Sequence, residues 1–181
     1  MLPAIPALLL LSACNSPAPD PEPGSVYGCG EDGRLEVELY GGISASLDWR
    51  ADELACEGMP RPNDEGARLR LSGPLGTGPG AKNVAFIIAL PDLQEGQPGS
   101  ELPTNVTLME EGSGRFFATR DTSGCWTDVT SQDPVGNGNG PEYRISGMLY
   151  CVSPLAELNG GSSISFTNLK FTGRLTWKPP E

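Results

Sequence analysis

Residues 34–49 read RLEVELYGGISASLDW, and this stretch decides the fold class. Apolar and polar side chains alternate on both sides of Gly41-Gly42, from Leu35 to Leu39 and again from Ile43 to Trp49. A period of two places alternate side chains on opposite faces of a β-strand. Glycine accepts the positive φ that a tight turn between strands requires. The stretch therefore predicts a β-hairpin with one buried face.

Similar strand patterns recur outward from this hairpin, separated by runs rich in Gly and Pro. Residues 84–90, VAFIIAL, are continuously apolar and predict a central strand covered on both faces. Further strands are expected at 67–72, 105–110, 115–120, 125–130, 143–151, 163–167 and 169–177. About nine or ten short strands predict an all-β, antiparallel β-sandwich, jelly-roll-like or Greek-key in its connections, with a flattened β-barrel as the alternative.

Charge and composition exclude several classes of function. The net charge is −11, and the 12 Lys and Arg are scattered along the chain. Binding to a nucleic acid duplex needs clustered positive charge, so we expect no nucleic-acid partner. The chain has no histidine, which excludes Ser-His-Asp and Cys-His catalysis and zinc sites of the Cys/His type.

The N-terminal segment carries the most specific motif. Residues 2–13, LPAIPALLLLSA, are apolar apart from Ser12 and too short to span a bilayer, but they suit the core of a signal peptide. They end in Leu11-Ser12-Ala13-Cys14, which resembles the bacterial lipobox. The resemblance implies that Cys14 receives a diacylglyceryl group and becomes the acylated first residue. No Lys or Arg precedes the apolar run, and a start upstream of Met1 would account for this departure from the family's pattern.

The sequence divides into three parts on these signals. Residues 1–13 are the expected signal peptide, residues 14–27 a lipidated cysteine with a proline-rich tether, and residues 28–181 a single β-sandwich domain. The partner implied by the lipobox is a membrane, reached through the lipid. Asn15 after the cysteine, by resemblance to Gram-negative lipoproteins, favours the outer membrane of the cell envelope over other locations.

Four cysteines remain once Cys14 is assigned to lipid, and an exported chain would pair them as two disulfides. Cys125 and Cys151 are equidistant from Gly138, at the centre of a Gly- and Asn-rich stretch, so a hairpin turning there would place them opposite each other. Cys29 and Cys56 miss direct opposition across the Gly41-Gly42 turn by two residues. We predict the pairs Cys29–Cys56 and Cys125–Cys151, although a sandwich could place either cysteine across the two sheets instead.

Candidate binding chemistry is sparse, and we expect no catalytic residue, no cofactor and no metal site. Oxygen ligands for Ca²⁺ are conceivable in or beside the glycine-rich stretch, at Asp128, Asp133, Asn137, Asn139 and Glu142, but their spacing matches no calcium loop. Residues 121–124, DTSG, predict a turn. Glu36 and Glu38 look like a solvated sheet surface.

The aromatic side chains raise a second binding possibility. Trp49, Trp126, Trp177 and Tyr40 could stack on sugar rings. Trp49 and Trp177 follow the phase of buried neighbours, which favours core packing, and Trp126 fits either interpretation. The expected function is therefore a non-enzymatic binding or envelope-structural module whose ligand is a glycan or a protein. The alternative is a carboxylate-dependent glycoside hydrolase or another polysaccharide-acting enzyme.

Overall fold

A computed structural model describes residues 28–62, 65–78, 80–135 and 142–177. The expected signal peptide, Cys14, the tether, Asn137 and Asn139 lie outside the described residues. Within the described ranges, no helix is long and apolar enough to cross a membrane.

The regular elements of the described residues are thirteen β-strands, all of whose pairings are antiparallel. They are β1 (Arg34–Gly41), β2 (Ala45–Arg50), β3 (Ala55–Pro60), β4 (Ala67–Leu75), β5 (Lys82–Leu90), β6 (Gly99–Pro103), β7 (Asn105–Glu110), β8 (Arg115–Ala118), β9 (Cys125–Pro134), β10 (Glu142–Cys151), β11 (Leu155–Glu157), β12 (Ser163–Phe166) and β13 (Leu169–Thr176). The predicted all-β, antiparallel class is confirmed.

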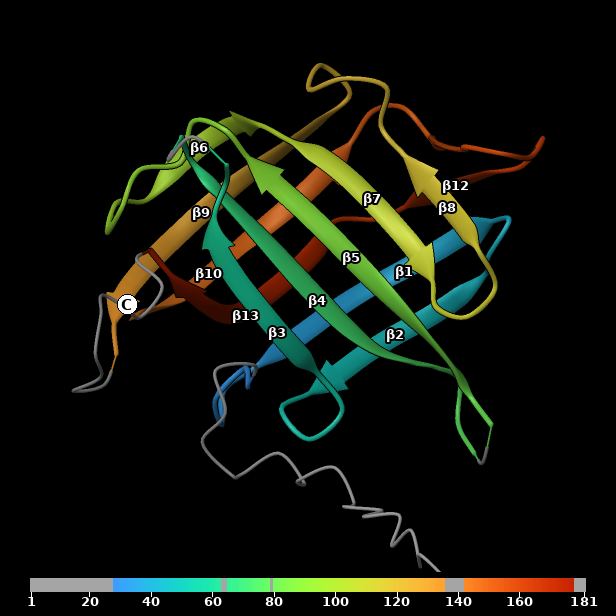
Figure 1. The fold of residues 1–181 in the computed structure, drawn as a ribbon, viewed down its shortest axis with the longest axis horizontal. Helices are drawn as coiled ribbons and strands as arrows, with labels where there is room; N and C mark the ends of the chain where they lie inside the picture. The colour runs from blue at the N-terminus through green and yellow to red at the C-terminus, as the bar shows by residue number, and fades with distance from the viewer. Residues whose placement is uncertain (1–27, 63–64, 79, 136–141, 178–181) are drawn as a thin grey trace, which may run out of the picture.

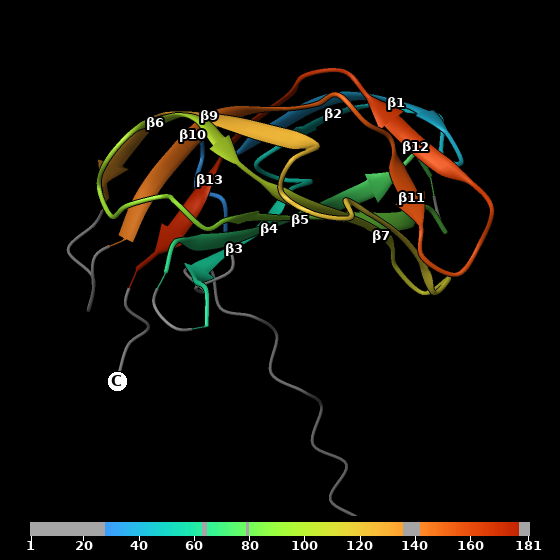
Figure 2. The same cartoon turned by 90° about the horizontal axis from the view of Figure 1, so that it is seen from above.

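The strands form one sheet that folds over into two layers (Figure 1 and Figure 2). Hydrogen bonding follows the order β3-β4-β5-β7-β8-β11-β12-β1-β13-β10-β9-β6, and β2 pairs with β1. In Figure 2, β3, β4, β5 and β7 lie in one layer, and β1, β2, β13, β10, β9 and β6 in the other. The sheet is open, with β3 and β6 at its two ends. The flattened-barrel alternative is therefore wrong.

The core lies between the layers and is built by the alternation read from the sequence. In the first hairpin Leu35, Val37, Leu39, Leu47 and Trp49 are all buried, and their polar neighbours face outward. Strand β5 is central, between β4 and β7, as predicted. Only one of its faces is fully covered along its length, because two residues on the other face, Ile87 and Ala89, are half-buried.

The register of the first hairpin differs from the prediction by one position. Leu35 faces Trp49 and Leu39 faces Ala45, so the turn centres on Gly42 rather than between Gly41 and Gly42. Directly paired residues point to the same face of a sheet. A centre on Gly42 pairs apolar with apolar positions, whereas the predicted centre would have paired buried residues with exposed ones.

Three strands were not predicted, so the expected count of about nine or ten was too low. Strand β3, ACEGMP, has no clear alternation. Strand β6, GSELP, lies inside the predicted 91–104 loop and contains a register shift. Strand β11 has only three residues. All three are held by pairing with a neighbour rather than by a pattern of their own.

Both predicted disulfides are present. Cys125 lies directly opposite Cys151 on β9 and β10, with S–S at 1.95 Å. From Gly147 to Cys151, each residue of β10 pairs with the β9 residue equidistant from Gly138, as predicted. A bulge at Ser146/Gly147 displaces the pairs closer to the turn by one residue. Cys29 precedes β1 and is bonded to Cys56 on β3, with S–S at 2.00 Å. Gly28, next to Cys29, forms an antiparallel bridge with Ala55, so this second bond fastens the segment before β1 to the edge strand β3.

Candidate functional site

Of the two tryptophans expected in the core, Trp49 is buried as predicted and Trp177 is only half-buried at its edge. Trp49 is 2% exposed, and its indole N–H donates to the carbonyl oxygen of Pro74 at 2.9 Å. The indole N–H of Trp177 donates to Oε1 of Gln132 at 2.9 Å, and the ring packs against the core. Trp49 is therefore a core residue, whereas the half-buried Trp177 ring also lines a hollow with Pro91 and Leu93 whose lining does not include Trp126.

Trp126 lies on the outer face of β9. Cys125, Thr127 and Val129 are buried and face the core, so Trp126 and Asp128 point the other way. The Trp126 ring stacks on Tyr150 of β10, with centroids 6.0 Å apart and planes inclined by 27°. Both side chains are half-buried. They form a stacked aromatic pair on the outer face of the sheet.

Tyr150 was missed by the sequence reasoning, although a signal for it existed. Trp126 and Tyr150 are equidistant from Gly138, like the cysteines one position further from it. The rule that predicted the disulfide thus also places Tyr150 directly opposite Trp126. The disulfide then fixes the register next to the aromatic pair.

Two carboxylates adjoin this pair. Oδ1 of Asp128 accepts hydrogen bonds from the backbone N–H of Glu101 at 2.7 Å and from the hydroxyl of Ser100 at 3.0 Å. Glu101 sits at the irregularity in β6 with φ of 49°, the left-handed region that side-chain-bearing residues rarely adopt. Such outliers often occur at functional sites. We call Glu101, Trp126, Asp128 and Tyr150 the outer-face patch.

The patch has a negative electrostatic environment. Burial raises the pKa of the Tyr150 phenol, and the negative charges of Asp128 and Glu101 raise it further. Tyr150 is thus neutral at physiological pH. Its hydroxyl is available as a hydrogen-bond donor beside two carboxylates.

A groove of about 400 Å³ begins next to the patch. It lies between the segment that joins β8 to β9 and the segment that joins β10 to β12. Gly124, on its wall, directly precedes β9 and lies two residues before Trp126 in the chain. Hydroxyl-bearing residues line it together with one charge of each sign: Thr119, Arg120, Asp121, Ser123, Ser153 and Ser163. We call this the hydroxyl groove.

The turn predicted at 121–124 shapes one wall of that groove. Oδ1 of Asp121 accepts hydrogen bonds from the backbone N–H of Ser123 at 2.8 Å and from the Ser123 hydroxyl. These bonds lower the pKa of the Asp121 carboxyl. On the facing segment the backbone N–H of Val152 donates to the carbonyl oxygen of Gly124 at 2.9 Å. The groove therefore has hydrogen-bonded walls on both sides.

Three further carboxylate candidates, Asp133, Glu36 and Glu38, are engaged elsewhere. Asp133 is paired with Arg144 at 3.0 Å, so it does not join Asp128 as a calcium ligand. In the part of the chain that the structure describes, no group of three or more His, Cys, Asp or Glu side chains could hold a metal ion. Glu36 pairs with Arg34 at 3.2 Å, and Glu38 accepts from the Ser46 hydroxyl at 2.5 Å. Both carboxylates belong to the polar outer surface of the sheet, as predicted.

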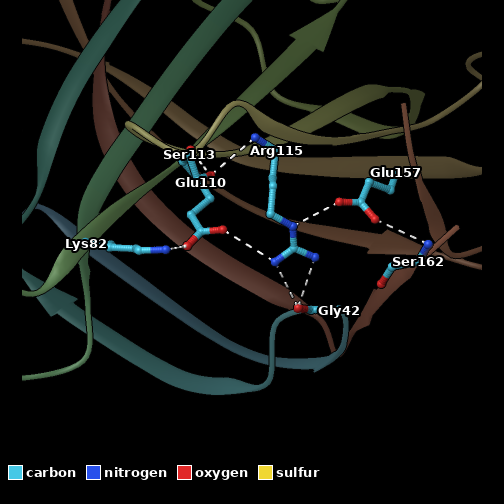
Figure 3. Close-up of polar contacts among 7 residues, drawn as sticks. All are labelled: Gly42, Lys82, Glu110, Ser113, Arg115, Glu157 and Ser162. Carbon is cyan, nitrogen blue, oxygen red and sulfur yellow. Dashed lines mark hydrogen bonds and ion pairs between the residues drawn. The ribbon is translucent and has the colours of Figure 1, made fainter. Parts of the chain in front are cut away.

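An ion network around the buried carboxylate of Glu110 lies away from the patch (Figure 3). The Glu110 side chain is only 6% exposed and accepts from the Lys82 ammonium at 2.5 Å and from the Arg115 guanidinium at 3.4 Å. Arg115 also donates to Glu157 at 2.9 Å and to the carbonyl oxygen of Gly42 at 3.3 Å. The network joins the β1–β2, β7–β8 and β11–β12 turns. All its charges are paired within the protein, so we assign it to stability.

The pKa shifts of four carboxyl groups argue against the glycoside hydrolase alternative. Glu110, Asp32, Asp121 and Asp133 all have a lowered pKa, because each accepts hydrogen bonds from cations, hydroxyls or backbone N–H groups. A general acid for glycoside hydrolysis needs the opposite, a raised pKa that keeps the proton near neutral pH. None of these four carboxyls is suited to that role.

Comparisons with known proteins complete the description of the site. No family model matches the chain, and neither a curated protein nor a solved structure matches it. The chain's own residues, above all the outer-face patch and the hydroxyl groove, are therefore the features that indicate a function.

Proposed function

We propose that this chain is an exported, lipid-anchored β-sandwich module that binds a glycan through the outer-face patch and the hydroxyl groove, without catalysing a reaction. The observation that carries the binding part is the stacked Trp126–Tyr150 pair on the outer face of the sheet. The proposed lipid is on Cys14, at the end of the lipobox-like segment.

Export is supported by the cysteines. The two disulfides use four of the five cysteines and leave Cys14 for lipid. Disulfides persist in oxidising compartments outside the cytosol. A lipidated protein in the cell envelope, on the outer membrane if Asn15 acts as a sorting signal, meets this condition.

Glycan binding is supported by the chemistry of the aromatic pair. One face of a sugar ring presents several C–H groups, and these pack on an aromatic ring, whose face is negative and apolar. Two stacked rings that the strand register holds in place lose little freedom when a sugar binds. Partial exposure of both rings leaves apolar area that a ligand would cover.

The hydroxyl groove supplies polar groups that could hydrogen-bond to the same glycan. Ligand sites combine apolar surface with a few placed polar groups that fix orientation. Serine and threonine hydroxyls both donate and accept, so they match the hydroxyl groups of a sugar. A chain of sugar units could stack one unit on the patch and place the next in the groove.

The test is a glycan array followed by isothermal titration with the full chain in detergent. We expect Trp126→Ala to weaken binding about tenfold or more, equivalent to about 1.4 kcal/mol. Tyr40→Ala is the matched control, because Tyr40 is 53% exposed on the same layer but outside the patch. Equal loss in both variants, or no loss in Trp126→Ala, would contradict the proposal. Release of reducing ends from a bound glycan would show instead that the chain is an enzyme.

A further inference from the structure

We infer, on the basis of the proposed function, that the sugar held by the outer-face patch carries a positive charge, as an amino sugar with a free, protonated amine does. The proposal adds a charge requirement to the glycan site. It concerns Glu101 and Asp128, which are placed beside the aromatic pair by three neighbouring strands.

The register puts aromatic and acidic residues in adjacent rows. Strand β9 pairs with β6 on one side and with β10 on the other. In the first row Pro103, Trp126 and Tyr150 are aligned across the three strands. In the second row Asp128 is aligned with Met148 of β10 and accepts the backbone N–H of Glu101 in β6. The carboxylates therefore lie one row from the stacked rings.

The negative charge of these two carboxylates is not neutralised by an ion pair among the described residues. The next cation along the second row is Lys170, which faces Met148 from β13. Lys170 is paired with Glu36, at 3.9 Å, on the side away from the patch, and its side chain is 62% exposed. The patch thus combines two carboxylates with aromatic faces and contains no basic residue.

Asp128 is oriented as well as charged. Ser100 and the backbone N–H of Glu101 both donate to Oδ1, which holds the carboxylate in one rotamer. A rotamer fixed in this way lets the second oxygen accept from a ligand without a large loss of side-chain freedom. Burial raises the pKa of Tyr150, and the negative charges of Asp128 and Glu101 raise it further, so both carboxylates act on this ring.

A protonated amine on a sugar interacts favourably with both the aromatic rings and the carboxylates of the patch. A cation near the face of Trp or Tyr is attracted by the ring quadrupole. A charge-assisted hydrogen bond from an ammonium to a carboxylate is stronger than a neutral one. The net charge of −11 draws cations to the molecule in general. An acidic sugar would be repelled, and a neutral one would gain only the stacking.

Two oligosaccharides of equal length and linkage separate these cases. β-1,4-linked glucosamine oligomers carry a free amine on each unit, and the N-acetylated oligomers are their uncharged counterparts. In isothermal titrations with the full chain at about pH 6, we expect the amine form to bind about tenfold or more tightly, with an affinity that falls as salt rises. Trp126→Ala should weaken both ligands.

Substitutions of the two carboxylates test whether they cause the preference for the amine form of the oligomer. Glu101→Gln and Asp128→Asn should reduce the preference for the amine form to about threefold or less, while binding of the N-acetylated form is kept. Glu53→Gln, an exposed acid in the β2–β3 turn, is the control and should leave the preference unchanged. The Glu101 side chain is exposed, so its variant should fold normally.

The outcomes distinguish this inference from the proposed function. Equal affinity for the two oligomers, or tighter binding of a different neutral glycan, would overturn the charge requirement and leave the glycan site standing. Tight binding of a lysine-rich peptide with no binding of any sugar would overturn both. An unchanged preference in Glu101→Gln and Asp128→Asn would also overturn the inference.

Discussion

The buried carboxylate of Glu110 shows at the residue scale how this fold handles charge. Its partners Lys82 and Arg115 come from different turns (Figure 3). Removing one partner of a buried ion pair costs about 3–5 kcal/mol when the other charge is left buried and unpaired. Here Lys82 is 60% exposed and Arg115 keeps Glu157, so we expect Glu110→Gln to lower the free energy of unfolding by about 2 kcal/mol. Urea denaturation measures this, with Glu38→Gln on the exposed surface as the control.

The difference in stability between wild type and Glu110→Gln should depend on pH. The hydrogen bond from Lys82 holds the pKa of Glu110 below its ordinary value of 4.5, against the opposing effect of burial. A carboxyl whose pKa is lowered by folding stabilises fully above its unfolded value, and this stabilisation is lost as the pH falls through the folded value. The stability gap between wild type and Glu110→Gln should therefore be full at about pH 7 and narrow below 4.5. A gap unchanged down to about pH 3 would mean that the charge of Glu110 does not contribute.

Gly58 tests the packing of β3 over β13. A Cβ at this position would lie 2.2 Å from the backbone oxygen of Arg174 and 2.7 Å from Cα of Leu175. Because backbone atoms cannot move aside as a side chain can, we expect Gly58→Ala to destabilise the protein by about 1–3 kcal/mol. Gly161→Ala is the matched control, since a Cβ at Gly161 would meet nothing within 4 Å. Thermal unfolding should show a drop in Tm of several degrees for Gly58→Ala alone, and equal Tm values would contradict the packing.

At the scale of elements, the Cys125–Cys151 bond connects stability to the site. It closes a loop across 26 residues, which stabilises by about 3 kcal/mol in the chain-entropy model. It also fixes the β9–β10 register one position from the Trp126–Tyr150 pair. We expect the double variant Cys125→Ala/Cys151→Ala to lose about 3 kcal/mol of stability and to bind glycan more weakly. The matching variant of Cys29 and Cys56 should lose stability but keep its affinity for glycan. If both double variants bound glycan with equal affinity, the Cys125–Cys151 bond would not be needed to hold the binding site in place.

Strands in which apolar and polar residues alternate could be predicted from the sequence. Strands that form only because they pair with a neighbouring strand could not. Strands β1 and β2 and both disulfide pairings follow from local patterns and from the symmetry of hairpins. Strands β3 and β6 have weak patterns and form because β4 and β9 offer unpaired edges. The folding of one sheet into two layers depends on the short β8–β11–β12 connection, which no local pattern indicates.

The candidate site was only partly predictable for the same reason. Trp126 was identified as ambiguous because its neighbour Cys125 begins a strand. Tyr150 could have been found from the hairpin symmetry. Glu101 could not, because its position beside Asp128 depends on the irregularity that pairs β6 with β9. The hydroxyl groove is made by two segments distant in sequence, so its residues share no local signal.

At the scale of the whole molecule, the proposed anchor decides where the site operates. Two or three acyl chains hold a protein stably on a bilayer, because each buried methylene contributes about 0.8 kcal/mol. We expect Cys14→Ser to leave an unprocessed or soluble protein that folds and keeps both disulfides. Detergent phase separation measures this, with wild type in the detergent phase and the variant in the aqueous phase. Retention of Cys14→Ser in the detergent phase would rule out an anchor at Cys14.

The proposed function requires that ligand binds at Trp126 and not elsewhere on the sandwich, and the three indole N–H signals in an NMR spectrum of the full chain distinguish these cases. Trp49 and Trp177 lie outside the patch and donate their indole N–H groups to Pro74 and Gln132, so their signals report other parts of the molecule. Titration with the glucosamine oligomer should shift the Trp126 signal and leave the other two in place. A Trp126 signal that stays fixed at saturating glycan, or shifts confined to Trp49 or Trp177, would contradict glycan binding at Trp126.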